Sequence, residues 1–265
     1  MYELERKRRI LDILNECYRV DVQGLIQELQ VSESTIRRDL KELEESNHLK
    51  RTHGGAIPLY NVHFEPSFIE KEISNCEQKK AIAEGAVQYI EDGDVILLDS
   101  GTTMLYLAKE LKRFKKLTIV TNAVPLAQEL QAYNGIELIF LGGSLRKEVM
   151  SLVGPFAEHI LSMIHVDKAF IATNGIHPVE GISTPNIDEA SIKRKMIASA
   201  KEVILLADSS KIDEVKHVKF AKLSDIQLFV TDDGISEESR DAFKQSGLML
   251  HVVPCSARKD EAGNS

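Results

Sequence analysis

Seven short apolar runs, separated by stretches with helical spacing, constrain the fold of this chain more than any other feature. The runs lie at 95–98, 117–121, 136–141, 168–173, 203–207, 227–231 and 248–252. Runs of this length suit buried strands, and repeated alternation of strands and helices is typical of a mostly parallel sheet with helices on both faces. A helix over 78–90 is expected before the first run. We therefore predict a larger, doubly wound α/β domain over residues 78–265.

Small and polar residues follow five of these runs. In sheets of this kind, ligands bind beyond the carboxyl ends of the strands. The first loop, Asp99-Ser-Gly-Thr-Thr103, opens a helix whose free N–H groups and hydroxyls suit a phosphate group. The later loops are Thr121-Asn122, Gly142-Gly143-Ser144 with Arg146 nearby, Thr173-Asn174-Gly175 and Asp208-Ser-Ser-Lys211. One such loop is ordinary in an α/β protein, but five at one edge indicate a site for a polar, phosphate-bearing ligand.

The N-terminal part has the pattern of a helix-turn-helix. Ser32 can cap a helix in which Ile36, Leu40 and Leu43 share one buried face. The outer face and its flanks carry hydroxyls and cations at Ser34, Thr35, Arg37, Arg38 and Lys41. A shorter helix precedes it, and the connection between the two is short enough for this motif. The second helix would then enter a DNA major groove.

A wing is expected after the second helix. Within residues 48–57, basic residues alternate with other residues up to Gly54-Gly55, a natural site for a turn. Lys50, Arg51 and His53 would contact the sugar-phosphate backbone beside the groove, where contacts set position and not sequence preference.

Composition and charge narrow the class of protein. The chain has 265 residues, 43% hydrophobic and 28% charged, which is ordinary for one or two globular domains. It contains no signal peptide and no apolar run of about 18 residues, so we expect a cytoplasmic protein with no membrane partner. The three cysteines form no paired motif, and we expect neither a metal site nor a cofactor. A net charge of −8 argues against general affinity for nucleic acid, which leaves the local cations at 6–9, 37–41 and 50–51 to attract DNA.

These patterns predict three parts of the chain. A winged helix-turn-helix DNA-binding domain occupies 1–57, a connector occupies 58–77, and the α/β domain occupies 78–265. The connector lacks a regular period, and its aromatic residues are expected to dock on one of the domains. Since one helix-turn-helix reads only a few base pairs, useful selectivity requires a homo-oligomer, a dimer or larger.

Several segments resemble the DeoR family of bacterial sugar-catabolism regulators. They are TIRRDL at 35–40, RTHGGA at 51–56, DGDVILLDSGTT at 92–103, DKAFIATNGI at 167–176 and LLADSSK at 205–211. The resemblance implies that the α/β domain is similar in fold to ribose-5-phosphate isomerase and binds phosphorylated sugars. It also implies a repressor of a carbohydrate-catabolism operon, released from double-stranded operator DNA by a sugar phosphate.

The resemblance further assigns residues to the effector site. By this likeness Ser100, Gly101, Thr102 and Thr103 would hold the phosphate. The residues that would approach the sugar are Asp99, Asn122, Gly142, Gly143 and Lys211.

Two other functions fit parts of the sequence. In a sugar-phosphate isomerase fused to a DNA-binding module, Asp99 and Lys211 could serve as general base and acid. Alternatively, the winged domain could dock on a protein. A DNA-binding domain makes sensing sufficient, and outward arginines and hydroxyls suit base edges better than an apolar interface. We therefore expect a regulator without catalytic residues.

Overall fold

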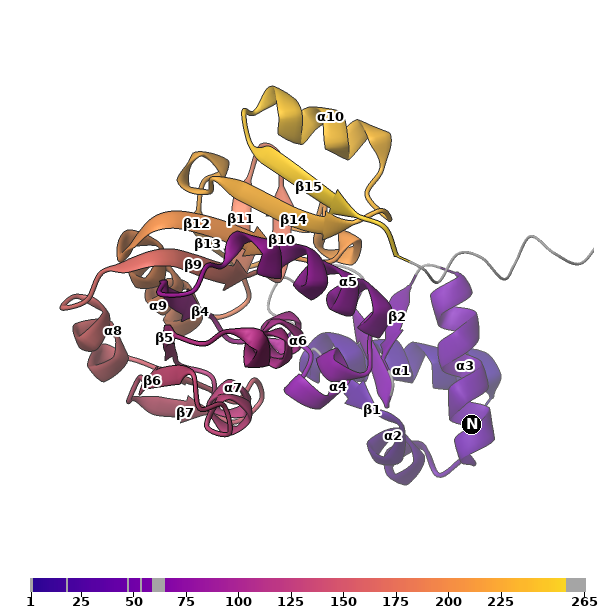
Figure 1. Cartoon of the computed structure of the whole chain (residues 1–265). Helices are drawn as coiled ribbons and strands as arrows, with labels where there is room; N and C mark the ends of the chain where they lie inside the picture. The colour runs from indigo at the N-terminus through magenta and orange to yellow at the C-terminus, as the bar shows by residue number, and fades with distance from the viewer. Residues whose placement is uncertain (1, 18, 47, 53, 59–64, 256–265) are drawn as a thin grey trace, which may run out of the picture. The chain divides into compact units, whose positions relative to one another are not determined.

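The computed structural model describes residues 2–17, 19–46, 48–52, 54–58 and 65–255 (Figure 1). The chain forms two compact units, Met1–Phe64 and Glu65–Ser265. The predicted connector, 58–77, is thus divided between the two units. Within the described residues, no helix is both long enough and apolar enough to cross a membrane.

The smaller unit is a helix-turn-helix with a small antiparallel sheet in the order β1-β3-β2, as predicted. Its elements are α1 (Glu3–Cys17), β1 (Val20–Asp21), α2 (Val22–Leu29), α3 (Glu33–Glu45), β2 (Leu49–Thr52) and β3 (Gly55–Pro58). Its core consists of apolar side chains from all three helices and the sheet, among them Ile10, Leu14, Leu25, Ile36, Leu40 and Leu49.

Side-chain caps start both helices of the motif. The Asp21 carboxylate accepts a hydrogen bond from the Gly24 N–H at 2.8 Å, and Ser32 Oγ accepts one from the Thr35 N–H at 3.3 Å. A Cβ atom at position 24 would lie 3.0 Å from Asp21 Oδ2. Gly24 weakens α2 by its low helix propensity, but it leaves room for the cap that begins this helix.

The larger unit contains a seven-stranded sheet in the order β15-β14-β12-β9-β4-β5-β6. Every neighbouring pair in this sheet is parallel. The strands correspond to the seven predicted runs, with ends shifted by at most a few residues: β4 (Val95–Leu98), β5 (Leu117–Thr121), β6 (Ile136–Phe140), β9 (Val166–Ala172), β12 (Ala200–Leu206), β14 (Leu228–Asp232) and β15 (Met249–Val253).

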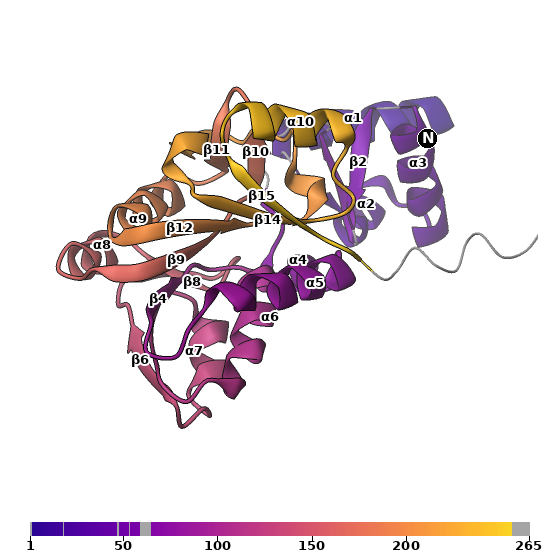
Figure 2. The ribbon, with the colours of Figure 1, turned by 45° about the horizontal axis from the view of Figure 1, so that its top comes forward.

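Helices cover both faces of this sheet, which confirms the doubly wound prediction (Figures 1 and 2). Apolar side chains of one face pack with helices α5 (Cys76–Ala86), α6 (Thr102–Glu110) and α7 (Val124–Leu130). The opposite face packs with helices α8 (Pro155–Leu161), α9 (Ile187–Ala198) and α10 (Glu237–Gln245). Neighbouring strand residues therefore enter different cores: Ile96 lies in the first and Leu97 in the second.

Shorter elements lie outside the main sheet and were not predicted. They are helix α4 (Phe68–Glu72), the antiparallel pair β7 (Ser144–Arg146) and β8 (Ser151–Val153), and the sheet of β10 (Gly175–His177), β11 (Gly181–Thr184) and β13 (Val218–Ala221). Short 3-10 turns occur at Val87–Tyr89, Leu111–Arg113, Ser209–Lys211 and Leu223–Asp225. The first of these continues α5, so the helix predicted over 78–90 ends in a tighter turn. Elements of three to five residues are too short to show a clear period.

Strand order creates a switch point between β4 and β9. From β4 the chain builds β5 and β6 on one side, then returns to the other side of β4 for β9, β12, β14 and β15. The loops after β4 and β9 therefore leave the sheet in opposite directions, and the gap between them is the usual ligand site of such a fold.

Candidate functional site

The outer face of α3 carries the predicted DNA-contacting residues. Ser34, Arg37, Arg38 and Lys41 are exposed and Thr35 is partly exposed. The opposite face of the helix is buried in the core of the smaller unit. Their contact with DNA remains a prediction, but the side chains lie on the surface that such contact requires.

Local ion pairs hold several of these cations. Arg37 pairs with Glu33 at 2.8 Å, Lys41 with Glu45 at 3.7 Å, and the wing residue Arg51 with Glu44 at 2.6 Å. Exposed pairs of this kind contribute about 1 kcal/mol or less, so DNA phosphates can replace the carboxylates. Within the described residues the Arg38 guanidinium makes no ion pair. Among the described residues, Arg38 can therefore bind a base without first breaking an ion pair, unlike Arg37 and Lys41.

The cations at 6–9 are largely used inside the smaller unit. Arg6 forms a two-point ion pair with the buried Asp39, with Nη2 3.0 Å from Oδ1. Lys7 pairs with Glu3 and Glu42, and Arg9 pairs with Glu28 at 2.7 Å. Three of the four cations expected at 6–9 are thus paired with carboxylates of the smaller unit.

The wing is formed by β2 and β3. Lys50 and Arg51 are exposed on β2, whereas His53 lies outside the described residues. A Cβ atom at Gly55 would stand 1.8 Å from the Val20 carbonyl oxygen. This glycine is required because β3 pairs closely with β1, a steric reason that the sequence pattern alone did not indicate.

In the larger unit, the loop 99–103 lies at the switch point, between the end of β4 and the start of α6. Gly101 is the N-cap residue of α6 and has φ 129°, a conformation that side chains disfavour. Because the N-cap residue is glycine, it supplies no side-chain hydrogen bond to the first turn. The N–H groups at such a helix start are suited to an anion.

Asp99 is fully engaged within the fold. Its carboxylate accepts hydrogen bonds from the Ser100 N–H at 2.7 Å and the Ala172 N–H at 2.9 Å. It also pairs with the buried Lys193 of α9, whose Nζ donates to the Ala172 carbonyl at 3.0 Å. A carboxylate held by a lysine and two N–H groups is a poor general base. Asp99 thus positions the loops after β4 and β9, and its approach to the sugar stays a prediction.

Asn122 follows β5 and is also buried. Its Nδ2 donates to the Leu152 carbonyl at 2.8 Å, and the Leu152 N–H donates to the Asn122 carbonyl at 2.8 Å. Its Oδ1 and the nearby Ser151 Oγ are buried without a hydrogen-bond partner among the described residues. Buried polar atoms are nearly always paired, so both atoms are suited to hydrogen bonds with a ligand's hydroxyls: the Asn122 oxygen as acceptor, the Ser151 hydroxyl as donor or acceptor.

The two glycines after β6 differ in what they require. Gly143 has φ 140°, and a Cβ atom there would lie 2.5 Å from the Val153 carbonyl oxygen. This glycine is needed for the β7–β8 pair whether or not a ligand binds. A Cβ atom at Gly142 would meet nothing within 4 Å. Their contact with a sugar therefore stays a prediction.

Lys211 ends the turn after β12, beside Asp208. The Asp208 carboxylate accepts from the Asn75 amide at 3.0 Å and from the Ser210 N–H at 3.1 Å. A second lysine, Lys79 of α5, lies in the same region and is buried. Burial lowers the pKa of Lys79 to about 8; the charge of Lys211 acts in the same direction and that of Asp208 against it. Sequence reasoning missed Lys79, which stands in an ordinary helical pattern.

A partly buried charge cluster joins the loops after β6 and β9. The Arg146 guanidinium is 2.6 Å from a carboxylate oxygen of Glu189 and 3.1 Å from one of Glu65. Glu65 also pairs with Lys71 at 2.7 Å and accepts from the Asn174 amide at 3.4 Å. Although burial opposes ionisation, the charges of Lys71 and Arg146 hold the pKa of Glu65 below its usual value. Burial raises the pKa of Glu189, and the charge of Glu65 adds to this effect.

The structure therefore brings four of the five predicted loops into contact with one another or with the segment before α5. It also adds Lys193, Glu65, Glu189 and Lys79, which the sequence did not single out. Lys193 stands in a Lys-Arg-Lys run that looks like a solvated face. Asn186, three residues before Glu189, is a recognisable helix start and does cap α9, but the pattern does not indicate that Glu189 is buried.

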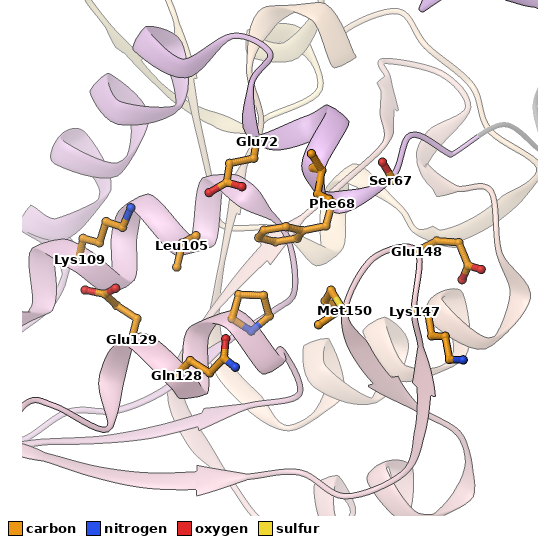
Figure 3. Close-up of a pocket in the computed structure, with 12 residues that line it drawn as sticks. Ser67, Phe68, Glu72, Leu105, Lys109, Gln128, Glu129, Lys147, Glu148 and Met150 are labelled. Atoms are coloured by element: carbon orange, nitrogen blue, oxygen red, sulfur yellow. The ribbon is translucent and has the colours of Figure 1, made fainter. Parts of the chain in front are cut away.

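An open hollow of about 550 Å³ lies beside this region, under α4. Phe68 extends from α4 into it, toward Leu105 and Met150 (Figure 3). The Phe68 N–H also donates to the Glu148 carbonyl at 2.6 Å. This aromatic residue of the predicted connector thus docks on the larger unit.

Comparison with known proteins gives matches over both units. Residues 6–60 match the family described as DeoR-like helix-turn-helix domain, and residues 74–233 match the DeoR C terminal sensor domain. The chain is 38% identical to the HTH-type transcriptional regulator GlpR of Haloferax volcanii, over 94% of this chain and 98% of that protein. It is 39% identical to the HTH-type transcriptional repressor GlcR of Bacillus subtilis, over 98% of this chain and 100% of that protein.

A more distant likeness was found among solved structures. Ribose 5-phosphate isomerase A of Methanocaldococcus jannaschii is 20% identical, with a TM-score of 0.39 over 52% of this chain and 55% of that one. At this distance the likeness says nothing about activity.

Proposed function

Because this chain belongs to the DeoR family of helix-turn-helix transcriptional regulators, we propose that it represses a carbohydrate-catabolism operon and leaves its operator when a phosphorylated sugar binds. The helix-turn-helix implies DNA as one partner, and the sensor domain implies a small-molecule effector. The family is one of regulators, not of enzymes.

The observation that carries the choice of effector is the placement of loop 99–103. This loop follows β4 at the switch point of the sheet, and it begins α6 with a glycine cap, which supplies no side-chain hydrogen bond to the first turn. Hydroxyls at Ser100, Thr102 and Thr103 stand in the same loop. Such a helix start favours an anionic group, and the buried polar atoms of Asn122 and Ser151 favour a ligand that also carries hydroxyls.

The arrangement of charges supports binding over isomerisation. Asp99, the candidate general base, is already paired with Lys193 and accepts two backbone hydrogen bonds. Proton abstraction would require an accessible base poised beside the substrate. We therefore propose that the site holds the sugar phosphate unchanged.

Operator binding measured against a panel of sugars tests this function. An operator is first selected from random duplex DNA with the full chain. Its affinity is then measured with phosphorylated sugars and with their unphosphorylated counterparts. We expect at least one phosphorylated sugar to weaken binding by roughly 5- to 150-fold, a typical allosteric coupling, and its unphosphorylated form to have little effect. Release by the free sugars alone, or conversion of the sugar phosphate at an enzymatic rate, would refute the proposal.

A further inference from the structure

Residues 65–75, here called the strap, cross the carboxyl ends of the strands in the larger unit. The strap includes α4 and contacts several of the predicted effector loops. Thr102 Oγ1 donates to the Lys71 carbonyl at 3.5 Å, and Asn75 Nδ2 donates to the Asp208 carboxylate at 3.0 Å. The buried Lys79 donates to the strap carbonyls of Lys71 and Ser74.

The strap contacts the predicted phosphate loop, whose three hydroxyl-bearing residues are buried. Ser100 is 8% exposed, Thr102 is 3% exposed and Thr103 is 8% exposed. The Thr102 hydroxyl already donates to the strap carbonyl of Lys71, and α4 packs against α6. A phosphate can contact the hydroxyls and N–H groups of this loop only if neighbouring groups make room. The strap is the segment whose contacts a ligand would have to replace.

Glu65 anchors the start of the strap in a setting built for an anion. Its side chain is 8% exposed. Both terminal nitrogens of Arg146 donate to Glu65 Oε2 at 3.1 Å, and the Asn174 amide donates to Oε1 at 3.4 Å. Arg146 belongs to β7 and Asn174 follows β9, so neither donor is part of the strap and both would stay in place if the strap moved. A guanidinium fork with an amide beside it suits a phosphate or carboxylate ligand.

We propose that Glu65, paired with Arg146 and Asn174, holds the strap over loop 99–103, and that a phosphate entering this region opens the strap by displacing the Glu65 carboxylate from these donors. The inference rests on the proposed function and adds the means of regulation. Glu189 keeps its own pair with Arg146 at 2.6 Å and holds the guanidinium in position during the exchange. Glu65 is the first residue of the larger unit, so its release acts where the chain arrives from the DNA-binding unit.

The test compares Glu65→Gln with Glu72→Gln in the full chain, with inorganic phosphate as the probe. Both variants remove one negative charge from the strap, but Glu72 is exposed on α4. Phosphate affinity is measured by calorimetry, and opening of residues 65–75 is measured by hydrogen exchange. Glu65→Gln should bind phosphate about tenfold more tightly than the unmodified chain. A strap that is closed in about ten of every eleven unmodified molecules lowers their apparent phosphate affinity by about that factor, and the variant removes this closure. Its strap amides should exchange faster without phosphate, whereas Glu72→Gln should match the unmodified chain.

Lys71→Met provides a second route that leaves Arg146 intact. It removes the strap's own cation from Glu65, so amides 65–75 should again exchange faster than in the unmodified chain. The inference would be overturned if Glu65→Gln left phosphate affinity and the exchange of the strap amides unchanged. It would also be overturned if Glu72→Gln changed both as much as Glu65→Gln does. These readouts need no operator and no identified sugar. A failure of the proposed function would instead appear as an operator complex that no phosphorylated sugar releases.

Discussion

At the scale of single residues, buried charges set the geometry of both units. Asp39 follows Arg38 directly in the sequence but faces the opposite way: it is 0% exposed and binds Arg6 of α1. The pair orients α3 against α1 and thereby directs Arg38 outward. In the larger unit, the ion pair of Lys193 with Asp99 holds the loop that begins at Asp99.

Loss of one partner of the Arg6–Asp39 pair should destabilise the smaller unit strongly. Arg6→Met leaves Asp39 buried and uncompensated, so we expect a loss of roughly 3 to 5 kcal/mol in unfolding free energy. Arg6→Met combined with Asp39→Leu should recover most of this loss, since an apolar pair of similar volume removes the buried charge. Hydrogen exchange of the α3 amides in increasing urea measures this within the full chain. A double variant as unstable as the single one would contradict the argument.

Arg38 and Arg51 should differ in what they contribute to DNA binding. Arg38 lies on the exposed face of α3, where a groove-bound helix contacts base edges. Arg38→Ala should therefore cost roughly 1 to 3 kcal/mol on the selected operator and relax preference at one base position. Arg51→Ala in the wing should weaken operator and random DNA alike. Equal losses on both DNAs for both variants, in titrations at one fixed salt concentration, would show the assignment to be wrong.

Lys79 should make the stability of the larger unit depend on pH in the alkaline range. Its pKa of about 8 in the fold lies below its ordinary value of 10.5, because burial disfavours the charged amine. Between these values the unfolded chain binds the extra proton, so stability from this residue rises with pH from about 8 to about 10.5. Between pH 7.5 and pH 10, the unfolding free energy of the unmodified chain, measured in urea, should rise by about 2 to 4 kcal/mol relative to that of Lys79→Met. A constant difference between the two proteins would refute this.

At the scale of elements, the start of α6 determines the response to the effector. Thr102→Val with Thr103→Val keeps the β-branched shape of the loop but removes both hydroxyls. We expect the double variant to bind operator normally and to remain bound when a sugar phosphate that releases the unmodified chain is added. Operator affinity with and without that compound measures the effect. Release as complete as that of the unmodified chain would remove loop 99–103 from the phosphate site.

At the scale of the whole molecule, recognition of an operator requires more than one copy of the chain. The helix-turn-helix presents one recognition helix, α3, which covers only a few base pairs. We therefore predict a dimer or larger oligomer that protects two half-sites about one helical turn, or a multiple of it, apart. Sedimentation and footprinting measure both properties. A monomer that protects a single half-site would contradict this prediction.

The sequence by itself determined the helix-turn-helix and the seven strands of the main sheet, in their order along the chain. Apolar periodicity located all seven strands of the main sheet, and Ser32 indicated the start of α3, which the structure confirms. These features depend on neighbours only a few residues apart, so a linear pattern contains them. The same pattern placed the polar loops after their strands, and parallel strands have their carboxyl ends at one edge of the sheet.

Only the tertiary structure decided which charged groups meet. Asp99 and Lys193 are separated by 94 positions, Glu65 and Arg146 by 81, and Arg6 and Asp39 by 33. A buried charge binds whichever opposite charge the packing of helices and strands brings to it, and no local period records that partner. For the same reason the need for glycine at Gly55 and Gly143 emerged only when the opposing carbonyl oxygens were placed.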